Sequence, residues 1–164
     1  MNAEFFELML DNIPHGIYIL DDHGNYVYAN KAYIDSLGMG KEALIGSSVY
    51  DFVKRKEIKF CISDIVYREK KSVFMLQDVH IENGSEVHSF RQLIISNPVF
   101  DEAGNIQNII AICTPVDTLN HLYEKAEEDG MIHSYFKPSG ADDEEDNSVI
   151  ASSPSMKYIL KMAA

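Results

Sequence analysis

The sequence predicts an α+β protein in which a five-stranded antiparallel sheet carries its helices on one face. Polar turns rich in Asp, Asn and Gly separate neighbouring apolar runs at 22–25, 83–84 and 101–105, which is typical of β-hairpins. Apolar residues with helical spacing lie at 31–68, between the second and the third apolar run. Because hairpins pair neighbouring strands and the helical insert must cover an apolar side, we expect an antiparallel sheet with the helices gathered on one face.

The first thirty residues predict a short helix and then a hairpin. Residues 4–13 place apolar side chains on one stripe, which indicates an amphipathic helix that ends at Pro14. Residues 16–30 consist of two apolar runs around a polar turn. This pattern indicates two strands that pair with each other.

The helical insert is expected to begin at Asn30, whose side chain can cap a helix over residues 31–37. Gly38 ends that helix in the way that glycine does after a last helical turn, and a shorter helix ends at Gly46. Residues 57–68 have apolar side chains on one helical face, so we expect a longer helix there.

Three strands are expected after the insert, over 72–81, 86–100 and 106–116. The dipeptide Asn83-Gly84 is a strong signal for a two-residue hairpin turn and joins the first two of these strands. A longer polar turn joins the last two. The sheet therefore has five strands in all.

The composition favours one cytoplasmic domain with tails. A chain of 164 residues that is 46% hydrophobic can bury one core of ordinary domain size. No apolar run approaches the roughly 20 residues that span a bilayer, and the first residues do not resemble a signal peptide. Cys61 and Cys113 belong to no CxxC pair, so neither a disulfide framework nor a zinc site is expected.

The net charge of −12 argues against direct binding of nucleic acid, because most of the surface would repel phosphate groups. The charge is unevenly distributed along the chain. Residues 124–146 contain nine acidic side chains against only Lys125 and Lys137. The remainder of the chain is therefore only mildly acidic.

These features resemble the PAS domain, a small sensor fold of bacterial signalling proteins. The similar segments are GIYILDDHGNYVYANKAY (16–33), LIG (44–46) and SNPVFDEAGNIQNIIAICTPVD (96–117), and the resemblance covers about residues 4–117. PAS domains often close with Asp-Ile-Thr, whereas this chain has Pro115-Val116-Asp117. The exit from the last strand is therefore expected to differ from the family pattern.

A second resemblance concerns residues 149–164, VIASSPSMKYILKMAA. This segment is similar to the first helix of the AAA+ ATPase domain in sigma-54-dependent transcriptional activators, where a Ser-Pro-x-Met stretch precedes the ATP-binding loop. The predicted organisation is an amino-terminal cap helix (1–14), a PAS sensor domain (15–116), a linker helix (117–130), an acidic disordered linker (131–148) and the start of a truncated AAA+ domain (149–164).

Strand alternation divides the side chains of the last three strands between the two faces of the sheet. One face would line a ligand pocket beneath the helical insert, and the other would be covered by the amino-terminal helix or a second subunit. The residues expected on this second face are Val87, Ser89, Arg91, Leu93 and Ile95. With Asn83 and Gly84 as the turn, the expected cross-strand pairs are Val79 with His88, Gln77 with Phe90 and Met75 with Gln92.

The candidate pocket residues are chosen by strand alternation and by the resemblance to PAS domains. Similarity to flavin-binding PAS members implies that Gln92 and Cys113 face the ligand, and Ala111 then follows by alternation. An alternative is that Gln77 and Gln92 satisfy each other inside a packed core. The full set of candidates is Met75, Gln77, Val79, Phe90, Gln92, Ile94, Ala111 and Cys113.

Known PAS cofactors are not expected. A photoactive flavin member has an Asn-Cys-Arg segment before its long helix, and Cys61 has no such neighbours. A haem member has a histidine on or near that helix, and no histidine lies between His23 and His80. His80 and His88 are expected on opposite faces, which argues against a metal site between them.

The sequence therefore predicts a non-catalytic PAS sensor that regulates a sigma-54-dependent activator. A small ligand or partner would favour one arrangement of a homodimer, and the linker helix would transmit this preference to the AAA+ domain of the same chain. One alternative is a PAS module of a histidine kinase or another signalling protein. Another is a cofactor-bearing redox or light sensor, which visible absorbance of the purified protein would reveal.

Overall fold

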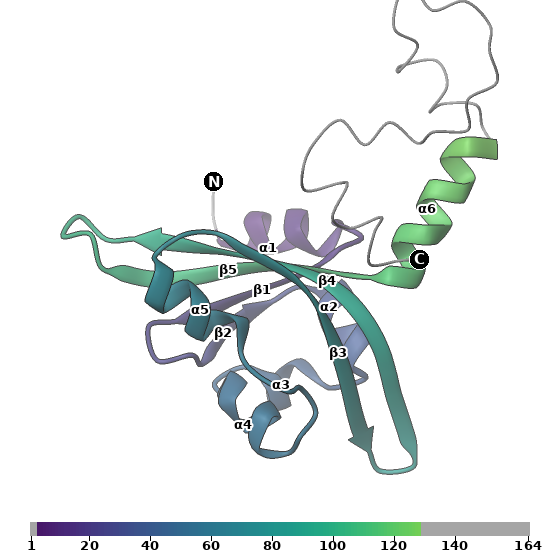
Figure 1. Cartoon of the computed structure of the whole chain (residues 1–164), viewed down its shortest axis with the longest axis horizontal. Coiled ribbons are helices and arrows are strands. Elements are labelled where there is room, and N and C mark those ends of the chain that lie inside the picture. Colours follow the sequence, from purple (N-terminus) through teal and green to yellow (C-terminus); the bar gives the residue numbers. More distant parts are fainter. Residues whose placement is uncertain (1–2, 129–164) are drawn as a thin grey trace, which may run out of the picture. The chain divides into compact units, whose positions relative to one another are not determined.

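Five antiparallel strands form a single sheet in the computed structural model, which describes residues 3–128 (Figure 1). The strands are Gly16–Asp21 (β1), Tyr26–Ala29 (β2), Val73–Asn83 (β3), Glu86–Phe100 (β4) and Ile106–Pro115 (β5). Their spatial order is β2-β1-β5-β4-β3. The first and last strands along the chain therefore lie side by side, and the predicted five-stranded antiparallel sheet is confirmed.

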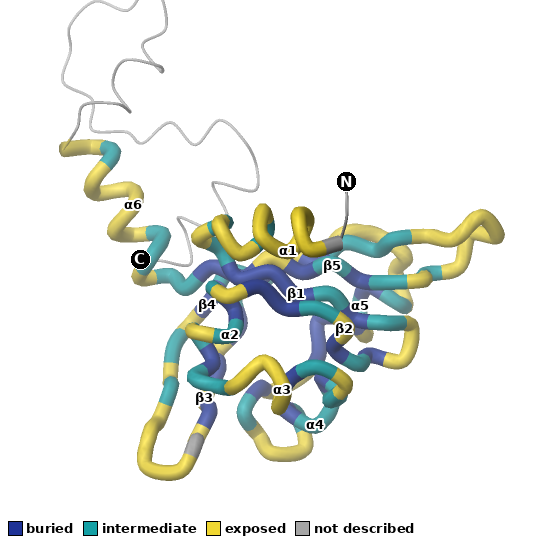
Figure 2. The backbone as a smooth tube through the Cα atoms, turned by 180° about the vertical axis from the view of Figure 1, so that it is seen from behind, coloured by how far each residue is buried: buried dark blue, intermediate teal, exposed yellow. Residues whose placement is uncertain are grey.

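The helices divide between the two sides of this sheet. Helices α3 and α4 lie on one side in both views and α1 lies on the other (Figures 1 and 2). Side chains from α2 to α5 share one buried cluster with the strands. We call the sheet face that packs against this insert the inner face and the opposite one the outer face. The helices are Ala3–Asp11 (α1), Lys31–Leu37 (α2), Lys41–Leu44 (α3), Val49–Lys54 (α4), Ile62–Glu69 (α5) and Val116–Glu128 (α6).

Helix α2 begins and ends as its sequence indicates. The side chain of Asn30 accepts a hydrogen bond from the backbone N–H of Tyr33, and Gly38 adopts a left-handed conformation with φ 62°. A Cβ atom at Gly38 would lie 2.1 Å from Nε2 of His88 on β4. Glycine therefore ends this helix and also leaves room for the β3–β4 hairpin to approach it.

The prediction of a long helix over 57–68 is wrong for its first turn, because only Ile62–Glu69 is helical. The backbone N–H groups of Glu57 and Ile58 both bond to the carbonyl of Phe52, and the carbonyl of Glu57 accepts from the N–H of His80 on β3. Residues 57–61 are thus held by tertiary contacts in an irregular segment. The sequence interpretation also missed the short helix α4.

Asn30 joins three parts of the fold through one buried side chain. Its Oδ1 accepts from the backbone N–H groups of Ile17 on β1 and Tyr33 on α2, at 2.8 and 3.1 Å. Its Nδ2 donates to the carbonyls of Leu10 on α1 and His15, both at 2.9 Å. The side chain is fully buried, so water could not take over the hydrogen bonds that Asn30 makes to these backbone groups.

Helix α6 follows β5 directly, because Val116 is its first residue and Pro115 is the last of the strand. Within the described residues, this helix covers 117–128 of the predicted linker helix (117–130). The predicted acidic linker (131–148) and AAA+ segment (149–164) lie outside the described residues. No helix in the described part of the chain is both long and apolar enough to cross a membrane.

Replacing Asn30 should destabilise the protein far more than replacing an exposed asparagine. We expect Asn30→Ala to lower the free energy of unfolding by about 3 kcal/mol, because it leaves several buried backbone groups without partners. Asn12→Ala, which removes one exposed hydrogen bond to Leu8, should cost less than about 1 kcal/mol. Urea unfolding measures both values, and equal losses would show that the Asn30 network is unimportant.

Candidate functional site

The β3–β4 hairpin brings two glutamines together on the inner face. Asn83 pairs with Glu86, so Gly84, with φ 64°, and Ser85 form the turn. The predicted pairing is wrong by two residues because Asn83 extends the strand. An even shift leaves every side chain on its expected face. The observed pairs are Gln77 with Gln92, Val79 with Phe90 and Met75 with Ile94.

The eight candidate residues lie in or against the core on the inner face. Four of them belong to the buried apolar cluster, and Met75 and Phe90 are half-buried against it. Gln77 and Gln92 are buried polar residues with 8% and 2% of their surface exposed. The four cluster members are Val79, Ile94, Ala111 and Cys113.

A small cavity lies beside the two glutamines. Its volume is about 10 Å³, which is about the space of one water molecule. Of the eight candidates, only Gln77, Val79 and Gln92 line it. The remaining lining residues are Tyr18, Tyr26, Tyr33, Leu37, Val49, Phe52 and Ile58.

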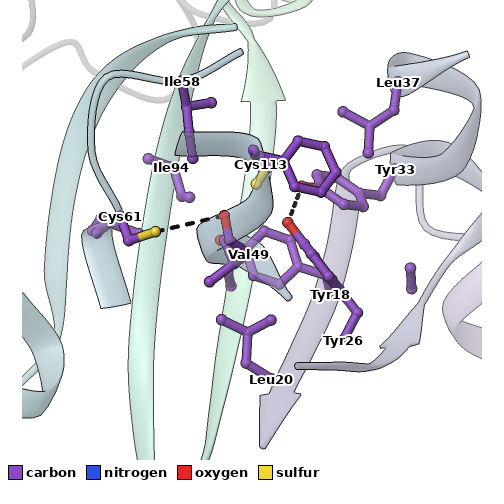
Figure 3. Close-up of a cluster of buried hydrophobic side chains, with 14 of the residues drawn as sticks. Tyr18, Leu20, Tyr26, Tyr33, Leu37, Val49, Ile58, Cys61, Ile94 and Cys113 are labelled. Atoms are coloured by element: carbon purple, nitrogen blue, oxygen red, sulfur yellow. Dashed lines mark hydrogen bonds between the residues drawn. The ribbon is translucent and has the colours of Figure 1, made fainter. Parts of the chain in front are cut away.

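The sequence interpretation missed the aromatic wall of this cavity. Tyr18 and Tyr26 come from the two strands of the first hairpin and bring their rings into contact, and Tyr33 comes from α2 (Figure 3). Strand alternation places Tyr18 on the same face as Leu20, so its inward position could have been predicted from the hairpin pattern. Tyr33 could be assigned to the site only once the position of α2 over the sheet was known.

The tyrosines form a closely packed group of rings. The ring centroid of Tyr18 lies 5.2 Å from that of Tyr26 and 4.8 Å from that of Tyr33, and Phe52 lies 5.7 Å from Tyr26. The hydroxyl groups of Tyr26 and Tyr33 are 3.2 Å apart and share a hydrogen bond (Figure 3). Burial raises the pKa of Tyr18, Tyr26 and Tyr33 above the usual value for tyrosine. All three are therefore neutral at physiological pH.

The glutamine pair leaves one polar atom unsatisfied. Nε2 of Gln92 donates to Oε1 of Gln77 at 3.1 Å, and Nε2 of Gln77 donates to the carbonyl of Phe60 at 3.2 Å. Oε1 of Gln92 is buried and has no hydrogen-bond partner among the described residues. A buried acceptor of this kind costs about 1–3 kcal/mol. The sequence left open that Gln77 and Gln92 satisfy each other inside a packed core. They do bond to each other, but the carbonyl of Gln92 stays without a partner among the described residues.

An open groove of about 480 Å³ adjoins the cavity. Ile58 and Val79 line both spaces, so these side chains stand between the groove and the cavity. The groove also reaches Val116 and Asp117 at the start of α6. A movement of the irregular segment around Ile58 would thus affect the cavity and the surroundings of α6 together.

Neither cysteine has the environment of a reactive thiol. Cys61 and Cys113 are both buried and free of disulfides. Burial raises the pKa of Cys61 to about 12, and that of Cys113 is raised as well. In the part of the chain that the structure describes, no three His, Cys, Asp or Glu side chains come together in a group that could hold a metal ion.

Comparison with known proteins agrees with the architecture. A family model described as "PAS fold" matches residues 10–119. The virulence sensor protein BvgS of Bordetella pertussis is 27% identical over 113 residues, which are 65% of this chain and 9% of BvgS. The BvgS protein of Bordetella bronchiseptica is 25% identical over 134 residues, or 76% of this chain and 10% of that protein. The chain thus spans about a tenth of the length of these relatives.

Solved structures show the same fold at low sequence identity. The PAS domain of an HTR-like protein from Haloarcula marismortui has a TM-score of 0.52 and 16% identity, covering 69% of this chain and 90% of that one. A PAS domain from a two-component sensor histidine kinase has a TM-score of 0.53 and 13% identity, covering 68% of this chain and 94% of that one.

Replacing both glutamines should stabilise the protein if they are kept for a purpose other than folding. We expect Gln77→Met/Gln92→Met to raise the free energy of unfolding by about 1 kcal/mol, because removing an unsatisfied buried acceptor at constant side-chain volume outweighs the loss of the part-buried bond to the carbonyl of Phe60. Thermal and urea unfolding would measure this change. A loss of about 2 kcal/mol or more would show instead that the pair is a structural hydrogen bond.

Proposed function

The chain belongs to the PAS family, and from this premise we propose that it senses a small molecule on the inner face of its sheet and regulates a sigma-54-dependent transcriptional activator. The proposed sensing of a small molecule rests on one observation. Gln77 and Gln92 place polar groups beside a cavity in the centre of the domain, where apolar packing would be more stable. Buried polar groups that do not satisfy one another are typical of a site built to recognise something else.

Ligand entry would require the irregular segment at 57–61 to move. This segment is attached to β3 by two hydrogen bonds, from the N–H of His80 to the carbonyl of Glu57 and from Nε2 of Gln77 to the carbonyl of Phe60. A ligand that enters beside the glutamines would displace this segment and so break the second of these bonds. The closed cavity thus represents the ligand-free member of a two-state equilibrium.

The signal would leave the domain through α6. The groove next to the cavity is lined by residues of the irregular segment and by Val116 and Asp117 of α6. Displacement of the segment changes the contacts available to the first turn of this helix. A ligand that binds the open state more tightly would therefore shift the position of α6 by population shift.

The regulated domain is proposed from the sequence of the tail. Residues 149–164 are similar to the first helix of the AAA+ domain in sigma-54-dependent activators, and a helix followed by an acidic linker precedes them in the expected order. The alternative is a PAS module of a histidine kinase. A phosphoacceptor helix would show His-Glu followed by Pro, whereas His121 is followed by Leu122 and Tyr123.

We also propose that two copies of this chain associate through α1 and the outer face. Apolar side chains are exposed on α1, where Leu8 has 62% of its surface accessible. The outer face adds a row of register neighbours across three strands, in which Ile95 on β4 pairs with Phe74 on β3 and with Ile112 on β5. All three are exposed. Two adjoining apolar surfaces of this kind are typical of a homodimer interface.

Native mass spectrometry of the full-length protein tests the sensor function. We expect a small molecule to copurify with the wild type and to be lost from Gln92→Leu, which removes the free acceptor. Gln107→Leu is a matched control, because Gln107 is an exposed glutamine on β5. It should retain the molecule.

The released molecule then tests the regulation. Adding it back should change the rate of ATP hydrolysis by the wild type and by Gln107→Leu but not by Gln92→Leu. Retention of the molecule by Gln92→Leu would contradict the proposed site. A ligand-binding protein without ATPase activity would contradict the sigma-54 assignment and leave the sensor function standing.

Charge placed on α1 should separate the dimer. We expect Leu8→Glu/Met9→Glu to convert the dimer to a monomer in analytical ultracentrifugation, because both side chains are exposed and apolar. These changes leave the backbone carbonyls that Asn30 binds in place. Phe60→Glu changes an exposed apolar residue in the helical insert and should leave the dimer intact. A dimer that persists in the α1 variant would rule out this interface.

A further inference from the structure

The hydrogen-bonding groups around the cavity define what a ligand must supply. The amide of Gln92 donates to Gln77, and the amide of Gln77 donates to the carbonyl of Phe60. The carbonyl oxygen of Gln92 has no partner among the described residues, and Gln92 is only 2% exposed. The glutamine pair therefore lacks a donor. A ligand that satisfies it must carry an N–H or O–H group.

The tyrosine hydroxyls offer a proton for which a ligand must supply an acceptor. Tyr26 and Tyr33 share one hydrogen bond at 3.2 Å, which uses the proton of one hydroxyl and leaves the other proton available. Both residues line the cavity together with Gln92. Among the described residues that line it, the cavity thus presents an unpartnered acceptor on Gln92 and a hydroxyl donor on the tyrosine pair. A group with a donor beside an acceptor would satisfy both.

The walls of the cavity favour a flat and uncharged molecule. The rings of Tyr18, Tyr26, Tyr33 and Phe52 line it, and aromatic faces stack well on planar ligands. No Asp, Glu, Lys, Arg or His is among the described residues that line the cavity, so a charged ligand would have no counter-ion. Burial raises the pKa of all three tyrosines, so the wall itself carries no charge.

We propose that the ligand is a small, neutral, planar molecule that contains a cyclic amide or an equivalent donor–acceptor pair. Its N–H donates to Oε1 of Gln92, and its acceptor receives the free tyrosine hydroxyl proton. This inference rests on the proposed sensor function. The ligand must also enlarge the cavity, whose volume of about 10 Å³ holds about one water molecule in the closed state.

Two probes that differ only at the donor test this ligand class. 2-Pyridone carries an N–H beside its carbonyl, whereas N-methyl-2-pyridone lacks the donor. We expect the chain of residues 1–164 to bind 2-pyridone about tenfold more tightly, because one hydrogen bond to a buried acceptor is lost with the methyl compound. NMR titration measures both affinities. Benzoate, a planar anion, should not bind.

The glutamine variants assign the difference to Gln92. The preference for 2-pyridone should disappear in Gln92→Leu and persist in Gln107→Leu. Equal affinities of the two pyridones in the wild type, or tighter binding of benzoate, would overturn the ligand class. If no probe binds while a small molecule copurifies, the class is wrong and the sensor function stands. If no probe binds and nothing copurifies, both proposals fail.

Discussion

The buried amide of Asn30 is the contact on which the arrangement of the domain depends. It joins the first strand, the start of the helical insert and the end of the amino-terminal helix by hydrogen bonds of 2.8–3.1 Å to Ile17, Tyr33, Leu10 and His15. A side-chain amide can donate two hydrogen bonds and accept two without carrying a charge, whereas a hydroxyl donates only one. Because β1 also pairs with β5, the same residue fixes the helical insert relative to the middle of the sheet.

The position of the insert in turn determines the size of the cavity. Helix α2 presents Tyr33 to the rings of Tyr18 and Tyr26, and the space left beside these rings is about 10 Å³. The fold is thus compact in this conformation. A sensor built this way would spend binding energy on opening the cavity, so its response would depend on how much less stable the open state is.

The inner and outer faces place different demands on the sheet. The inner face holds buried polar groups at Gln77 and Gln92 and loses stability by it, since the side-chain carbonyl of Gln92 has no partner in the described part of the chain. The outer face exposes apolar groups at Phe74, Ile95 and Ile112. The proposed ligand site rests on the first of these features, and the proposed dimer interface rests on the second.

The strands, the hairpins and the face on which each side chain of the last three strands lies could be predicted from residues close together in the chain. Alternation has a period of two, so the error of two residues in the β3–β4 pairing did not exchange the faces, and Gln92 is buried as expected. Capping by Asn30 and Gly38 was readable because it depends on residues close in the chain. These features are all local.

Contacts between residues distant in the chain could not be predicted and follow from how the elements pack in three dimensions. The segment at 57–61 has helical periodicity, yet its backbone bonds to Phe52 and to His80 on β3 and is irregular. The aromatic wall combines Tyr18 and Tyr26 from the first hairpin with Tyr33 from α2 and Phe52 from α4. Local propensity carries no information about such contacts, because their energy comes from packing between elements that the sequence pattern leaves unplaced.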